Sequence, residues 1–322
     1  LGMRFRYRFY FTWIALLWIC PQLYAQRDSS AVAQIARHIQ LDSVTIIASR
    51  NGFDVPAFIQ RVKDDTTFYK AFKTLRIIGF TADNHMWIYN KQGKMVAAYS
   101  SLTHQIVHNG CRSLQVLQEN TTGNFYKNKN KKTYNYYTAE MFAHVFLDPG
   151  PVCGEDNLVH GGKPEMKDPN HQIQKHIEEL KQLIFNPGQP IPGIPFVGHK
   201  VGIFEPDISP MYDFAIHSDV VDDEPCYVFQ AIAKPRFADQ VVIDTLITWF
   251  RKSDYSIISR HYALSYKTLV FDFNVNIHVD LGSYQGTLIP TWIDYQGNWD
   301  IAFHKREIVH FTIRFFDFDI GK

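Results

Sequence analysis

The feature that most constrains the fold is a strictly alternating run of apolar and polar residues near the C-terminus. From Phe271 to Asp280 the odd-numbered positions are apolar and the even-numbered positions are polar or charged. A period of two is typical of a strand with one buried and one exposed face. Strand-like runs surround it, at residues 211–217, 225–233, 240–251, 256–264, 286–295 and 298–318. We expect the last run to hold two strands and the whole to form a large antiparallel sheet.

The first 25 residues have the composition of an export signal. Arginines between residues 4 and 8 precede an apolar stretch at 9–20, and Ala25 fits a cleavage site. This stretch is short for a bilayer span of roughly 20 residues, which favours a cleaved signal over a transmembrane anchor. The sequence therefore predicts a signal peptide at 1–25, a periplasmic or outer-envelope location, and no stable transmembrane anchor.

The charge balance argues against a nucleic-acid partner. Loss of the signal removes three of the 33 basic residues and none of the 32 acidic ones, so the remaining chain is close to neutral. Nucleic-acid binding normally needs a basic field.

Three cysteines follow the signal: Cys111, Cys153 and Cys226. An oxidising compartment permits one disulfide and one free thiol among them. We expect Cys111 to pair with Cys153, because both lie at loop-like junctions rich in glycine or proline. Cys226 begins an apolar strand, where a buried free thiol is common.

We divide the rest of the chain into a leader at 26–52, with a short strand at 42–49, and a single α+β domain at 53–322. Asp54 and Pro56 are suited to the start of a helix, and a second helix follows near residue 66. The period then changes to two, which predicts strands on both sides of the glycine turn at 91–93 and a further strand at 113–119.

The middle of the chain is less regular. The run at 124–137 is expected to be a strand end, a solvated turn and another strand. Residues 171–185 have the apolar spacing of a helix. The proline-rich apolar segment at 189–210 predicts a lid over the sheet.

Motifs for chemistry are sparse. The sequence lacks GxSxG, HExxH, P-loop and GxGxxG patterns, so we expect neither a catalytic site nor a cofactor. His104 and His108 would lie about 13 Å apart along a strand, too far to share a metal. His278 shares its strand face with Asp280, but solvated surface is the favoured interpretation. The loop from Cys153 to His160 has the composition most like a site, with a thiol, two carboxylates and an imidazole.

Aromatic residues recur along the predicted strands and the lid. Core packing alone would explain them. A curved sheet with one aromatic face, a helix and an apolar lid is also the layout of a lipid-binding cup. The expected cup residues are Phe196, Phe204, Trp249, Phe271, Phe273, Trp292 and Phe303.

Two neighbouring segments resemble the periplasmic lipoprotein carriers of outer-membrane sorting. The stretch from Val241 to Lys252 is similar to the tryptophan-bearing strand of that family, and the turn with Ile257-Ile258-Ser259-Arg260 after it is similar to its charged turn. Leu288-Ile289-Pro290-Thr291 resembles a later strand of that family. The resemblance implies an open β-barrel closed by helices. The chain departs from the family in its length and in the region from Cys111 to Gly162. It is equally similar to secreted bacterial proteins of unknown function.

The sequence thus predicts a curved antiparallel sheet or open half-barrel that wraps one or two helices under a lid. The leading functional hypothesis is non-enzymatic binding of a lipid or acylated ligand in an apolar cup in the cell envelope. One alternative is a structural or interaction module with a self-filled core and an envelope protein as partner. The other is a hydrolase that uses the loop from Cys153 to His160.

Overall fold

The computed structural model describes residues 31–128, 133–154, 184–190, 198–267, 271–301 and 304–319. The predicted signal peptide at 1–25 lies outside the described residues. Within the described ranges, no helix is both long enough and apolar enough to cross a membrane.

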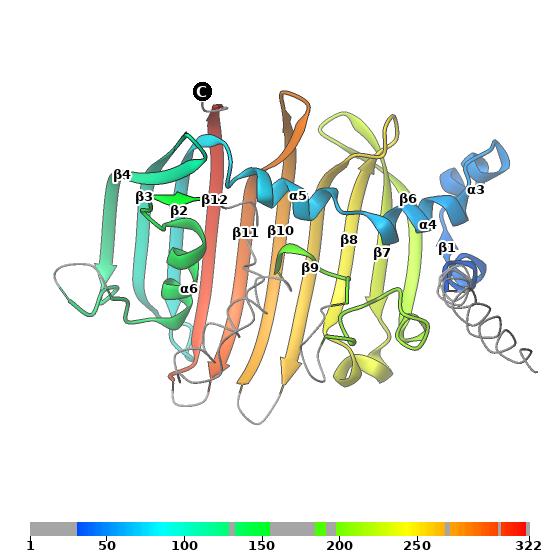
Figure 1. The fold of residues 1–322 in the computed structure, drawn as a ribbon. Helices are drawn as coiled ribbons and strands as arrows, with labels where there is room; N and C mark the ends of the chain where they lie inside the picture. Colours follow the sequence, from blue (N-terminus) through cyan, green and yellow to red (C-terminus); the bar gives the residue numbers. More distant parts are fainter. Residues whose placement is uncertain are drawn as a thin grey trace, which may run out of the picture.

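The fold is built on one sheet of 12 strands in the order β1-β6-β7-β8-β9-β10-β11-β12-β2-β3-β4-β5. The strands are β1 (Gln40–Leu41), β2 (Gly79–Tyr89), β3 (Met95–His108), β4 (Cys111–Gly123), β5 (Val152–Cys153), β6 (Tyr212–Val221), β7 (Glu224–Ala233), β8 (Ile243–Arg251), β9 (Ile257–Lys267), β10 (Phe271–Tyr284), β11 (Thr287–Ile301) and β12 (Glu307–Asp319). Their pairings are antiparallel except for β1 with β6, which is parallel. The sheet does not close, so the predicted α+β fold with an open, curved sheet is confirmed (Figure 1).

Alternation in β10 divides the sheet into two faces, as predicted. Phe273, Val275, Ile277 and Val279 are each at most 2% exposed. The intervening side chains from Asn274 to Asp280 are exposed or half-buried. We call the buried side the inner face and the opposite side the outer face.

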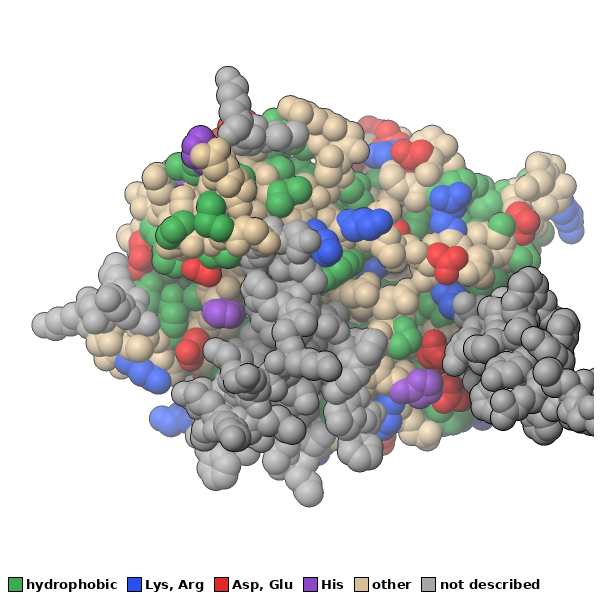
Figure 2. Space-filling view, viewed as in Figure 1, with side chains coloured by type: hydrophobic (Ala, Val, Ile, Leu, Met, Phe, Trp, Pro, Cys, Tyr) green, Lys and Arg blue, Asp and Glu red, His purple; other side chains and the backbone are tan. Residues whose placement is uncertain are grey.

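Helices cover the inner face. The named helices of the described residues are one over residues 31–38, α3 (Ser43–Arg50), α4 (Val55–Asp64), α5 (Thr67–Thr74) and α6 (Tyr137–Phe146), with short 3-10 turns at Ser209–Met211 and Pro235–Gln240. Helix α3 lies at the end of the sheet beside β6 (Figure 1). Figure 1 shows α4 and α5 crossing this face and α6 lying on it beside β12. On this side acidic and basic side chains are interspersed (Figure 2).

The two helices predicted after residue 53 are present as α4 and α5. The Asp54 carboxylate accepts a hydrogen bond from the Ala57 N–H at 3.0 Å, which caps α4 as its position suggested. Phe58, Ile59 and Val62 form the buried side of α4.

The strand predicted at 42–49 is wrong, because these residues form helix α3. The Asp42 carboxylate accepts hydrogen bonds from the Thr45 N–H at 2.7 Å and from the Ser218 N–H of β6 at 2.9 Å. It therefore starts a helix and ties it to the sheet, which overrides the β-propensity of the β-branched residues. The leader's strand is instead β1, at Gln40–Leu41.

Two further boundaries differ from expectation. Residues 298–301 extend β11 instead of starting the next strand, because Trp299 stays in register with Phe273 of β10 and is buried. The strand expected after the turn in 124–137 is reduced to a bridge between Tyr126 and Tyr134, and α6 follows it.

Cys111 and Cys153 form the predicted disulfide, and Cys226 is a buried free thiol. The disulfide joins the register partners of β4 and β5.

Most of the helix predicted at 171–185 lies outside the described residues, but residues 184–185 are helical. The predicted lid is described at 189–190 and 198–210. In its second part Val201, Ile203, Phe204 and Ile208 are buried in the main core. This part of the lid is a packed cover of the sheet.

Candidate functional site

A small apolar cavity lies between the inner face and its helices, and we call it the inner seam. Its volume is about 30 Å³, close to the space of a single water. The walls come from α5, α6, residues 184–185 and strands β9 to β12. The lining residues are Phe72, Met141, Phe142, Val145, Phe146, Ile184, Phe185, Tyr262, Ile277, Val279, Ile293, Tyr295 and Phe311.

The polar atoms in this lining are already engaged. The Tyr262 hydroxyl donates to the carbonyl of Ile184. The Tyr295 hydroxyl accepts from the Trp299 indole N–H at 2.8 Å. Burial raises the pKa of both tyrosines, so both hydroxyls stay protonated at neutral pH. The seam therefore presents an apolar surface.

Helix α6 forms one wall of the seam and is held at its N-terminus by β12. The buried Glu307 carboxylate accepts hydrogen bonds from the Tyr137 N–H and the Thr138 N–H, both at 3.0 Å. It also accepts from the Thr138 hydroxyl at 2.7 Å. A carboxylate at a helix N-terminus satisfies unpaired backbone donors and complements the helix dipole.

The far end of α6 packs through aromatic rings. The Phe142 ring lies 4.8 Å from Phe311 between centroids, and the Phe146 ring lies 6.3 Å from Phe185. Such ring contacts are less directional than the hydrogen bonds that Glu307 accepts.

The predicted cup residues are dispersed. Phe204 and Phe273 are buried on the inner face. Trp249 and Trp292 are half-buried on the outer face, where the Trp249 indole donates to Asp219 at 2.9 Å. Phe196, Phe303 and the Phe271 side chain lie outside the described residues. Those that are described do not line the seam.

Sequence reasoning missed the contribution of α6 to the seam. The signal was the run from Met141 to Phe146, in which five of six residues are apolar. The sequence just before this run gives no capping signal. The cap of the helix comes instead from Glu307, 169 residues from Thr138.

On the outer face, Ser259, His278 and Asp280 lie within hydrogen-bonding distance of each other. The Ser259 hydroxyl lies 3.2 Å from His278 Nε2 and donates to Asp280 at 2.8 Å. His278 Nε2 lies 2.9 Å from the same carboxylate. The hydrogen bond to Asp280 raises the pKa of His278. Although burial opposes it, hydrogen bonds from His278 and Ser259 lower the pKa of Asp280.

This cluster does not have the geometry of a catalytic triad. In a triad the serine and the carboxylate contact different imidazole nitrogens, so that a proton passes through an oriented ring. Here both contact Nε2. The described part of the chain also contains no group of three or more histidine, cysteine, aspartate or glutamate side chains placed to bind a metal.

The loop proposed for a hydrolase begins at Cys153, whose sulfur is bonded to Cys111. A disulfide sulfur is not a thiolate nucleophile. The remaining residues of this loop, 155–160, lie outside the described residues.

Comparisons with known proteins give matches among solved structures. No family model and no curated protein matches the chain. A DUF1329 family protein from Desulfovibrio piger has 10% identity and a TM-score of 0.23, over 78% of this chain and 90% of its own. A domain provisionally named as an outer membrane lipoprotein-sorting protein, from Vibrio parahaemolyticus, has 10% identity and a TM-score of 0.24, over 76% and 88%. Lipovitellin has 6% identity and a TM-score of 0.23, over 76% of this chain and 26% of its own.

The predicted resemblance to lipoprotein carriers thus has a counterpart among solved structures.

Proposed function

We propose that this protein is a non-enzymatic carrier of the cell envelope that binds the acyl chain of a lipid or acylated ligand in the inner seam. The observation that supports the proposal is the seam itself. Its lining is aliphatic and aromatic from four strands and three helical segments, and its tyrosine hydroxyls are engaged within the protein.

The seam must widen to accept an acyl chain, because a cavity of about 30 Å³ is too small to hold one. Burial of a methylene group contributes about 0.8 kcal/mol, so a chain of about 12 methylenes contributes roughly 10 kcal/mol. Unseating one large apolar side chain costs about 1.5–3 kcal/mol. Displacing the few side chains at one end of α6 is therefore within reach of an acyl ligand.

Helix α6 is the wall that we expect to move. Glu307 holds its N-terminus through three hydrogen bonds, and aromatic rings pack against its C-terminal part. The helix would rotate about Glu307 and open the seam near Phe146.

The test is binding of a fluorescent fatty acid to the purified protein, together with native mass spectrometry for a co-purified lipid. We expect saturable binding, competed by unlabelled fatty acid. Phe146→Ala removes a half-buried ring from the movable end and should speed uptake of the probe severalfold. Phe237→Ala, which removes a half-buried ring far from the seam, is the matched control.

Absence of both co-purified lipid and saturable probe binding would contradict the proposal. It would favour the second candidate function, a structural or interaction module with a self-filled core. That candidate is supported by the small volume of the cavity.

A further inference from the structure

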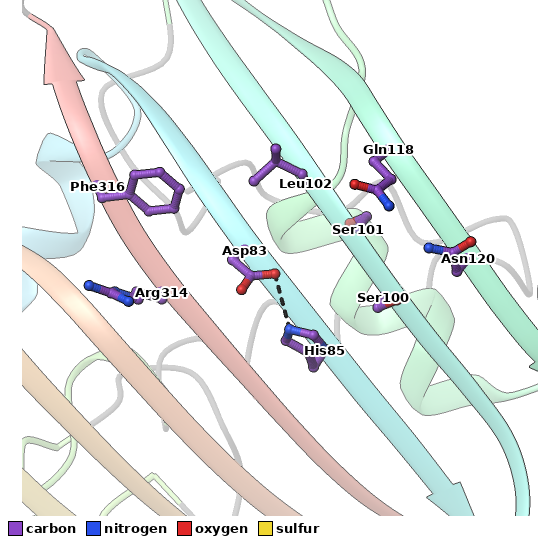
Figure 3. Close-up of a pocket in the computed structure, with 9 residues that line it drawn as sticks. All are labelled: Asp83, His85, Ser100, Ser101, Leu102, Gln118, Asn120, Arg314 and Phe316. Carbon is purple, nitrogen blue, oxygen red and sulfur yellow. Dashed lines mark ion pairs between the residues drawn. The ribbon is translucent and has the colours of Figure 1, made fainter.

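A second hollow, larger than the seam, lies on the outer face, and we call it the outer groove. Its volume is about 460 Å³. Figure 3 shows side chains from four neighbouring strands, β12, β2, β3 and β4, around it. The lining residues are Asp83, His85, Ser100, Ser101, Leu102, Gln118, Asn120, Arg314 and Phe316.

Strand register explains how these residues meet. Arg314, Asp83, Leu102 and Gln118 occupy one row of paired positions across the four strands. Register shifts by one residue between Leu102 and Thr103, beside the groove. A bulge of this kind increases local twist and re-aims side chains, which is consistent with a hollow on a sheet face.

The groove offers hydrogen-bond donors and acceptors together. Asp83 is an acceptor and is paired with His85 at 3.0 Å. Arg314 is exposed, and within the described part of the chain no ion pair joins its guanidinium to a carboxylate. Gln118 and Asn120 are exposed amides that both donate and accept.

Apolar and aromatic surface completes the groove. Leu102 and Phe316 are half-buried in its wall. Along β2 the His85 ring stacks on Trp87 with centroids 5.7 Å apart, and Trp87 lies 5.1 Å from His310 of β12. These rings lie on the same face of β2 and β12 as the groove residues.

The charges select the class of ligand. An anion attracted by Arg314 would also face the Asp83 carboxylate, and a cation attracted by Asp83 would face Arg314. A neutral ligand with many hydroxyl groups avoids both conflicts, because each hydroxyl both donates and accepts. The apolar C–H face of a sugar ring also matches aromatic surface. A volume of about 460 Å³ lies within the usual range for small-molecule sites.

We propose that the outer groove is a saccharide-binding site. The sugar is either free or part of a larger glycan. This site is on the opposite face from the inner seam and does not depend on the proposed acyl binding.

The experiment is saturation-transfer difference NMR on the full mature chain. The free-sugar arm contains glucose, N-acetylglucosamine and maltose at millimolar concentration, and the glycan arm contains soluble dextran. Inorganic phosphate is titrated separately. We expect transfer to ring protons of at least one carbohydrate probe. Transfer in the free-sugar arm identifies a site for small sugars, and transfer from dextran alone identifies a glycan site.

Gln118→Ala and Asn120→Ala each remove an amide from the groove and should weaken binding about threefold to tenfold, the effect of one hydrogen bond. Gln115→Ala removes an exposed amide from the same strand outside the groove and should leave binding within twofold. All three positions are exposed, so folding should be preserved. Lack of transfer from every carbohydrate, equal affinity in Asn120→Ala and Gln115→Ala, or tight binding of phosphate alone would overturn the proposal.

Discussion

At the scale of single residues, Arg260 joins the helices to the sheet. It is 5% exposed, its Nε donates to the Thr248 hydroxyl at 3.0 Å, and its guanidinium lies 4.2 Å from the centre of the Phe68 ring. Asp65, between α4 and α5, supplies a carboxylate at 3.7 Å. Burial lowers the pKa of Arg260, and Asp65 opposes that shift. The charge is therefore tolerated inside the fold only with its partner.

Asp65→Asn should destabilise the protein by about 3 kcal/mol, because it leaves Arg260 buried without a counter-charge. The asparagine oxygen still accepts from the Thr67 N–H, as the carboxylate does at 3.1 Å, so the variant loses the charge and only the longer bond from the Phe68 N–H, at 3.4 Å. Urea denaturation measures the change. Asp64→Asn, at a neighbouring exposed carboxylate, is the control and should change stability by less than about 0.5 kcal/mol. Equal effects of the two variants would contradict this role for Arg260.

The His278 and Asp280 pair should make stability depend on pH. The pKa of His278 is raised in the fold, so its contribution is complete below the ordinary value of 6.5 and declines as pH rises through the folded value. The pKa of Asp280 is lowered, so its contribution is present above 3.8 and is lost as pH falls through its folded value.

The stability difference between the native protein and His278→Gln should therefore be largest between about pH 4 and 6 and shrink toward pH 8. Its size should be below about 1 kcal/mol, because the two side chains are 40% and 44% exposed. Thermal unfolding at several pH values measures it. The same comparison in an Asp280→Asn background should lose its pH dependence, and a dependence that persists there would contradict the assignment.

At the scale of elements, α6 depends on a residue far away in the chain. Glu307 is 7% exposed, and its two oxygens satisfy the first backbone donors of the helix. Helix and strand are therefore coupled, and weakening this anchor should loosen the wall of the inner seam.

Glu307→Gln should cost about 1–3 kcal/mol, because the amide brings its own donors toward the N–H groups of Tyr137 and Thr138. If α6 is the moving wall, the variant should also take up the fatty-acid probe faster than the native protein. Stopped-flow fluorescence and urea denaturation measure the two effects. Glu224→Gln, at an exposed ion pair with Arg251, is the matched control and should change neither strongly. Loss of stability without faster uptake would argue that α6 does not open.

At the scale of the whole molecule, an open sheet of 12 strands has two edges, β1 and β5, and a disulfide joins the edge strand β5 to its neighbour β4. The bond between Cys111 and Cys153 closes a loop with a sequence separation of 42 that contains α6. The disulfide lowers the conformational entropy of the unfolded chain and keeps the α6 segment next to the sheet.

Replacing both cysteines by alanine should lower the free energy of unfolding by about 4 kcal/mol, the entropic expectation for a loop of this length. Urea denaturation measures the change. All variants carry Cys226→Ala, so that the free thiol cannot exchange with the disulfide. Adding reductant should destabilise the disulfide-containing protein by a similar amount and leave the double alanine variant unchanged. A response of that variant to reductant would contradict the assignment.

Several features were predictable because their causes are local in sequence. Alternation from Phe271 to Asp280 determines which side of β10 is buried, and Asp54 with Pro56 determines where α4 begins. The disulfide was predictable because glycine or proline residues beside Cys111 and Cys153 indicate loop-like junctions, whereas Cys226 begins an apolar strand.

Other features depend on partners that the local pattern does not contain. Helix α3 replaces the predicted strand because Asp42 bonds to both Thr45 and β6, and α6 forms where Glu307 of β12 reaches its first turn. Trp249 lies on the outer face although its aromatic character suggested the cup.

The sequence by itself determined the antiparallel sheet, its two faces and the disulfide, because side-chain alternation and turn residues act within a few positions of each other. Only the tertiary structure decided that helices and part of the lid nearly fill the space over the inner face and that polar side chains of four strands surround a groove on the outer face. Those outcomes depend on strand register and on contacts between residues far apart in the chain, which set which side chains share a surface.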